Sequence, residues 1–163
     1  MEGGGYCFAS VVIPKPDLLS TFYTLSSLDR LGVSMDEDTA TIQFLISLQQ
    51  DDGSFSGKML GTPDIEDTFF ALASLDLSDS LESVDLDMSY QFLTSSLSEK
   101  LSLTDIAWSV MSLDILKQEF NGQPIDEQIQ RMQRSEGAFV MDDEMSLGYT
   151  YYALQALYCI NSI

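Results

Sequence analysis

The sequence predicts an all-α fold made of tandem helix pairs, and two observations lead to this prediction. A short apolar pattern rich in aromatic residues returns four times along the 163 residues, and a more amphipathic segment follows each of the first three returns. Repeats of this spacing are typical of arrays in which every unit is a pair of helices. We therefore expect about three and a half helix pairs in a single domain over residues 1–163.

The returning pattern predicts the inner helix of each pair. Its four copies begin at residues 21, 68, 106 and 150, so that successive copies stand 47, 38 and 44 residues apart. In the first copy Tyr23, Leu25 and Leu28 form, together with Phe22, a wide apolar face at helical spacing. All three other copies keep this order of an aromatic residue, an aliphatic residue and leucine at i, i+2 and i+5. Small residues between the large ones allow neighbouring inner helices to approach closely.

The amphipathic segments predict outer helices over residues 36–50, 85–97 and 125–134. Helices in an outer layer are expected to have one face exposed to solvent. Each segment also begins with acidic residues, which complement the partial positive charge at the start of a helix. At the starts of the inner helices we expect capping side chains from Ser20, Asp67 and Asp105.

A glycine-aromatic turn is predicted after the first and the third outer helix. These turns are residues 52–55 (Asp-Gly-Ser-Phe) and 136–139 (Glu-Gly-Ala-Phe), and glycine permits the left-handed conformation that closes a helix. Residues 98–100 take this place in the middle unit, and residues 4–6 look like the end of a preceding unit. The chain is therefore expected to begin within a repeat.

The charge of the chain argues against two classes of partner. Its 26 acidic and 7 basic residues give a net charge of −19, which repels phosphate backbones and anionic lipid. We expect no nucleic-acid binding and no membrane span, since no run approaches the roughly 18 apolar residues that a span needs. Without an N-terminal signal, and with Cys7 and Cys159 far apart in sequence, free thiols in the cytoplasm are expected.

The repeat unit resembles that of a known family. Residues 44–57 followed by 67–72 are similar to the prenyltransferase and squalene cyclase repeat, with the greatest likeness to the β subunit of protein geranylgeranyltransferases. The resemblance implies an α/α toroid, with inner helices lining a central cavity. Because about three and a half helix pairs make only part of the family's ring, we expect the chain to be a fragment, a partial, open toroid, or one part of a ring that a second copy or another chain completes.

The family's zinc site does not carry over to this sequence. Protein prenyltransferase β subunits hold zinc with an aspartate, a cysteine and a histidine, whereas this sequence has no histidine. Neither Cys7 nor Cys159 has the Asp-x-Cys context. We expect no metal ligands and no cofactor, with a divalent cation at residues 142–144 as an alternative to a solvated acidic loop.

An acidic motif at the second inner helix allows two interpretations. Class II terpene cyclases carry Asp-x-Asp-Asp-Thr at such a point, and residues 64–68 here resemble it with Glu66 in the central position. The resemblance implies a catalytic role for Asp64, Glu66 and Asp67, because clustered carboxylates can hold one proton at a raised pKa. The structural alternative is a turn followed by a helix cap.

Aromatic residues of the inner helices are the candidate ligand-binding residues. Tyr23, Phe70, Trp108 and Tyr152 belong to a ladder that could line an isoprenoid cavity. The alternative is packing of neighbouring inner helices against one another.

Three functions follow from these features. The first is a binding or assembly module without its own zinc site, which holds a hydrophobic ligand or a protein partner on its concave face. The second is a subunit or fragment of a protein prenyltransferase. The third is a cyclase-like enzyme that uses Glu66 and Asp67.

Overall fold

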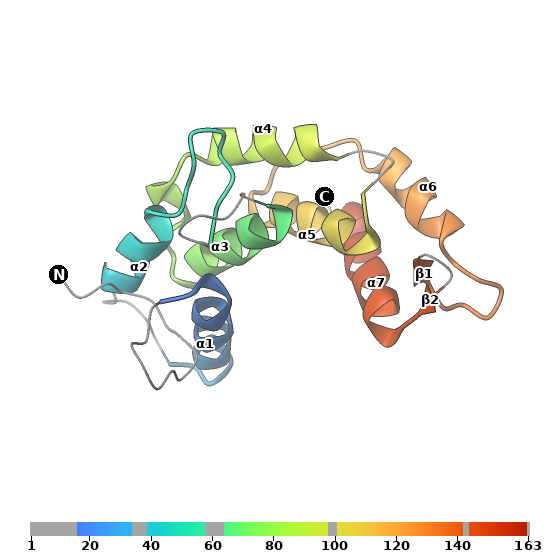
Figure 1. Cartoon of the computed structure of the whole chain (residues 1–163), viewed down its shortest axis with the longest axis horizontal. Helices are drawn as coiled ribbons and strands as arrows, with labels where there is room; N and C mark the ends of the chain where they lie inside the picture. The colour runs from blue at the N-terminus through green and yellow to red at the C-terminus, as the bar shows by residue number, and fades with distance from the viewer. Residues whose placement is uncertain (1–15, 34–38, 58–63, 98–100, 142–143, 163) are drawn as a thin grey trace. The chain divides into compact units, whose positions relative to one another are not determined.

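The computed structural model confirms an all-α fold and describes residues 16–33, 39–57, 64–97, 101–141 and 144–162 (Figure 1). Helical segments account for almost all of the regular structure in these ranges. They are α1 (Leu18–Arg30), α2 (Thr39–Ile46), α3 (Ile65–Leu77), the 3₁₀ turn η1 (Leu81–Ser83), α4 (Leu86–Ser96), α5 (Leu103–Ile115), α6 (Gln123–Arg131) and α7 (Leu147–Ser162).

The inner helices α1, α3 and α5 begin at caps that lie three residues before the predicted ones, and α7, for which no cap was predicted, begins at Ser146. The prediction of Ser20, Asp67 and Asp105 as caps is wrong, because these residues donate their backbone N–H groups to the true caps. An N-cap oxygen accepts from the amide about three residues on, so polar residues at both positions make the sequence ambiguous. The capping bonds run from Ser20 to Asp17 (2.8 Å), from Asp67 to Asp64 (2.7 Å), from Asp105 to Ser102 (3.0 Å) and from Tyr149 to Ser146 (3.0 Å).

These four caps repeat at the spacing of the sequence pattern. They stand at residues 17, 64, 102 and 146, which are again 47, 38 and 44 residues apart. Position within an inner helix can therefore be counted from its cap, and equivalent positions in different helices can be compared directly.

The outer helices are shorter than predicted at their C-terminal ends. Helix α2 ends at Ile46 rather than Gln50, because the N–H of Gln50 pairs with the carbonyl of Ser54 at 2.8 Å. In the same way α6 ends at Arg131, since the N–H of Arg134 pairs with the carbonyl of Ala138 at 2.8 Å. The glycine turns thus take the backbone groups that would have extended each helix.

The chain divides into two compact units, one ending at Phe92 and the other beginning at Leu93. In the first unit α1 packs on α3, and α2 also contacts α3 (Figure 1). Helix α3 is buried along an unbroken run from Thr68 to Leu75. Such all-round burial is expected of an inner helix with neighbours on both sides. The single domain over residues 1–163 stays a prediction.

In the second unit α5 packs on α7, and α6 covers α7 from outside (Figure 1). One apolar cluster joins these three helices and the aromatic of the second glycine turn. Its buried members are Leu103, Ile106, Ala107, Val110, Ile125, Ile129, Phe139, Ala153, Ala156 and Cys159.

Two very short strands were not expected from the sequence. They are β1 (Val140–Met141) and β2 (Glu144–Met145), and they pair antiparallel with Val140 opposite Met145 and Met141 opposite Glu144. They follow the second glycine turn directly. No helix within the described ranges is long and apolar enough to cross a membrane.

Candidate functional site

Aromatic rings of α1 and α3 form one contiguous cluster. The ring centres of Phe22 and Phe70 lie 5.0 Å apart, and those of Tyr23 and Phe70 lie 6.3 Å apart. Phe69 completes the cluster, with its ring 5.9 Å from that of Phe22. All these pairs are tilted, which is a favoured arrangement of aromatic quadrupoles.

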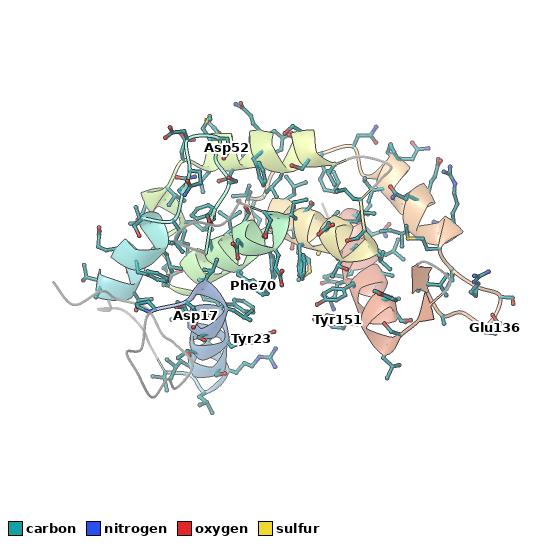
Figure 2. All side chains as sticks on the ribbon, viewed as in Figure 1. Asp17, Tyr23, Asp52, Phe70, Glu136 and Tyr151 are labelled. Atoms are coloured by element: carbon teal, nitrogen blue, oxygen red, sulfur yellow. The ribbon has the colours of Figure 1, made fainter. Side chains whose placement is uncertain are left out.

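The cluster has a buried base and an exposed rim. Phe70 is only 7% exposed, whereas Tyr23 is 55% exposed (Figure 2). Phe70 therefore serves to pack neighbouring inner helices against one another, which was the alternative to ligand binding in the sequence analysis. The half-exposed ring of Tyr23 remains open to an apolar molecule.

A second aromatic cluster joins α5 and α7. The rings of Trp108 and Tyr152 meet edge to face at 5.8 Å, and Tyr151 lies 5.5 Å from Tyr152 in the same kind of geometry. Trp108 and Tyr152 are half-buried, and Tyr151 is exposed on α7 (Figure 2). Structure thus brings the four predicted ligand residues together in two pairs, Tyr23 with Phe70 and Trp108 with Tyr152.

The acidic motif at the start of α3 is held by local hydrogen bonds. Asp64 is exposed and caps the helix. The Asp67 carboxylate accepts the N–H of Gly57 at 2.8 Å and so ties α3 to the end of the first glycine turn. Glu66 is half-buried between them along the helix. Asp64 and Asp67 therefore have structural roles in holding the start of α3, while a catalytic role of the three carboxylates stays a prediction.

Among the residues that the structure describes, no group of three or more aspartate, glutamate, cysteine or histidine side chains lies close enough together to hold a metal ion. Residues 142 and 143 of the predicted cation loop lie outside the described ranges.

The one described cysteine does not fit the family's zinc site. Burial, followed by the negative charge of Asp114, raises the pKa of the Cys159 thiol to about 11, while Lys117 opposes this rise. Zinc is bound by a thiolate, so a buried neutral thiol in a chain without histidine does not match the Asp-Cys-His ligand set.

Two glycine turns support the inner helices from outside, and their backbones are alike. Gly53 and Gly137 have φ values of +85° and +89°, which few residues other than glycine adopt. The N–H of Phe55 is bound by the hydroxyl of Thr68 at 3.1 Å, and the N–H of Phe139 by the hydroxyl of Thr150 at 3.3 Å. Each glycine turn is therefore hydrogen-bonded to a threonine near the start of the next inner helix.

Asp52 shapes the first of these turns (Figure 2). Its carboxylate accepts from the hydroxyl and the backbone N–H of Ser54. These bonds, the hydroxyl first and the N–H second, hold the pKa of Asp52 below its usual value. The turn was predicted from the sequence, but the hydroxyl contacts of Ser54 and Thr68 were not. Threonine recurs at the start of the inner-helix pattern, and this recurrence could have indicated the contact made by Thr68.

Comparison with protein families agrees with this repeat structure. The family model described as the prenyltransferase alpha-alpha toroid domain matches residues 11–106 and 95–163, which together span most of the chain. A search of curated proteins found no match.

Proposed function

Because the chain belongs to the prenyltransferase alpha-alpha toroid family, we propose that it is a binding and assembly module that holds an apolar, isoprenoid-type ligand on the aromatic rings of its inner helices. The observation that carries the proposal is the pairing of aromatic residues from neighbouring inner helices, with an accessible ring at the edge of each cluster. Flat apolar faces of this kind suit a branched, unsaturated hydrocarbon chain.

The module acts without a zinc site of its own in this proposal. A buried neutral Cys159 and the lack of histidine support that part. The ligand is held by burial of hydrocarbon surface, which contributes roughly 25 cal/mol for each Å² removed from water. Recognition of a diphosphate would need several cations in one place, and the chain has only seven basic residues, of which Arg131 pairs with Glu127.

Trp108 supplies the reporter for a binding test. It is the only tryptophan of the chain and lies against Tyr152. We expect saturable quenching or a blue shift of its fluorescence when farnesol or geranylgeraniol is added. Native mass spectrometry then gives the stoichiometry, and the corresponding diphosphates are compared at the same concentrations.

Matched tyrosine variants locate the site. Tyr152→Ala should weaken binding about tenfold, since one ring contact and its buried area are worth on the order of 1.5 kcal/mol. Tyr158→Ala removes an exposed ring from the same helix, outside both clusters, and should leave affinity unchanged. Equal weakening by both variants, or no saturable signal with any isoprenoid, would contradict the proposal.

The same titration separates the two enzymatic alternatives. A transferase subunit would bind the diphosphates far more tightly than the alcohols. A cyclase-like enzyme would turn over a polyene and lose that activity in Glu66→Gln, which keeps the size of the side chain and removes its acid. Product formation from a polyene by the unaltered chain would replace the binding proposal with the cyclase function.

A further inference from the structure

The loop between α5 and α6 joins an asparagine to a glycine. Asn121 is exposed, and Gly122 follows it as the N-cap residue of α6. Because glycine has no Cβ, its backbone nitrogen is open to approach from the Asn121 side chain. The nitrogen of Gly122 and the Cγ atom of Asn121 can join in a five-membered ring. The loop therefore holds the atoms for an uncatalysed reaction of the chain with itself.

The hydrogen bonds around Asn121 leave the reacting nitrogen free and activate the carbon that it attacks. Within the described ranges the N–H of Gly122 donates to no acceptor. The Oδ1 atom of Asn121 accepts the N–H of Gln123 at 3.3 Å, which turns the side-chain amide toward the backbone that follows it. The same N–H polarises the Asn121 side-chain carbonyl and stabilises the negative charge that builds on Oδ1 during attack.

Two other sites carry similar groups in a protected state. At Asp52 and Gly53 the glycine N–H donates to the carbonyl of Gln50 at 3.0 Å, and the lowered pKa of Asp52 keeps its carboxylate ionised and therefore a poor target for attack. Asn161, the second asparagine of the chain, lies within α7, where its amide donates to a backbone carbonyl of the same helix at 2.7 Å. Only at Asn121 are both reacting groups unrestrained in this comparison.

We propose that Asn121 is a self-modification site, which converts to aspartate and isoaspartate in the native chain and thereby loosens α6. The Gly122 nitrogen bonds to Cγ of Asn121, the bond from Cγ to the side-chain nitrogen breaks, and ammonia leaves with the proton of the Gly122 N–H. Water then opens the ring. Opening at Cγ gives aspartate, whereas opening at the backbone carbonyl of Asn121 gives isoaspartate, whose main chain continues through Cγ.

The isoaspartate product changes the path of the chain at the start of α6. Its main chain is longer by one methylene group, and Gly122 packs so closely that a Cβ placed on it would lie 2.7 Å from the Cγ2 atom of Ile160. The longer link displaces either this contact or the first turn of α6, whose Ile125 and Ile129 are buried in the cluster with α5 and α7. The aspartate product keeps the chain path and places a negative charge beside a helix start, where it is favourable.

Incubation of the full chain in mildly alkaline buffer tests the reaction. Peptide mapping by mass spectrometry should find Asn121 converted, with the aspartate and isoaspartate peptides separated by chromatography. Because an exposed loop opens at little cost, the rate should lie within about threefold of that of the free peptide of residues 117–127. Asn161 should stay intact over the same time, and Asp52 should not isomerise.

Two outcomes of this incubation count against the proposal. A native chain that keeps Asn121 intact while the free peptide converts would show that the fold protects the site. Equal conversion of Asn121 and Asn161 would show that the hydrogen bonds described above do not select between them. Asn121→Gln, which keeps the amide but would have to close a six-membered ring, is the control and should show no conversion at this position.

A matched pair of chains separates the new backbone from the new charge. The isoaspartate form, enriched by chromatography, should show amide exchange at residues 125–131 about tenfold faster than the unmodified chain. Asn121→Asp carries the same charge on the ordinary backbone and should exchange no faster than the unmodified chain. Equal exchange in these two forms would overturn the predicted loosening of α6. None of these measurements uses an isoprenoid, so this proposal and the proposed function can fail independently.

Discussion

At the scale of single residues, Asp52 is a carboxylate whose neighbours change its proton affinity. Its folded pKa is depressed by the hydroxyl and N–H of Ser54. The resulting stabilisation is present above the pKa of the unfolded chain and is lost as pH falls through the folded pKa. Ser54→Ala should therefore raise the pKa of Asp52 part of the way to its usual value, as measured by carboxyl ¹³C NMR. An unchanged titration would show that the hydroxyl is not the main cause.

Thr68 offers a test of how the first turn is attached to α3. Its buried hydroxyl accepts the N–H of Phe55 and donates to the carbonyl of Asp64. Thr68→Val keeps the shape but leaves a buried N–H without its acceptor, which costs about 1–3 kcal/mol. Urea unfolding should show this loss. Thr104→Val, at a half-buried position near the start of α5, should change the free energy of unfolding by less than about 0.5 kcal/mol.

Cys159 should be chemically inert in the folded chain. With its pKa raised to about 11 by burial and by Asp114, only about one thiol in a thousand is ionised at pH 8. We expect no reaction of Cys159 with a thiol reagent at pH 8 until urea unfolds the chain. Peptide mapping identifies the modified cysteine, with Cys159→Ser as the control. Rapid labelling of Cys159 in the native state would show that the site is open to solvent.

At the scale of the elements, the two glycine turns have the same conformation and different neighbours. Gly53→Ala meets both an unfavourable positive φ and the backbone of α4, whereas Gly137→Ala meets only the former. A positive φ costs about 1–2 kcal/mol in a non-glycine residue, and a rigid overlap adds roughly 1–3 kcal/mol.

The two substitutions should differ in how much unfolding free energy they remove. Urea unfolding should show Gly53→Ala to be about 3 kcal/mol destabilising and Gly137→Ala about 1 kcal/mol. Similar losses at the two sites would mean that α4 does not pack on Gly53 as tightly as the structure has it.

At the scale of the whole molecule, the net charge of −19 opposes the folded state by self-repulsion. Salt screens this repulsion, with a Debye length of about 10 Å at 0.1 M. Thermal unfolding should therefore move to higher temperature as NaCl is raised from 10 mM to 0.5 M, by a few degrees for roughly 1 kcal/mol of stabilisation.

Magnesium chloride at matched ionic strength separates screening from a specific cation site. Equal shifts of the unfolding temperature by the two salts are expected from screening alone. A clearly larger shift with magnesium would instead favour the divalent cation alternative for the acidic residues 142–144. A fall in the unfolding temperature with NaCl would contradict the self-repulsion argument.

The helix-pair repeat, its spacing and the likeness to the family can all be recognised in the amino-acid sequence. Apolar side chains at helical spacing leave little choice of secondary structure, and the caps observed at residues 17, 64, 102 and 146 keep the predicted intervals. The position of each cap did not follow, because Asp64 and Asp67 are both good capping residues and only the backbone shows which one accepts.

Whether equivalent residues have the same neighbours depends on how the helices pack. Gly53 and Gly137 have almost the same local sequence and conformation, but α4 seats on the first and no described residue seats on the second. Likewise Phe70 is buried by α1 while Tyr23 stays half exposed. Local pattern fixes what a segment can bury, and only its place in the array decides whether a neighbour is there to bury it.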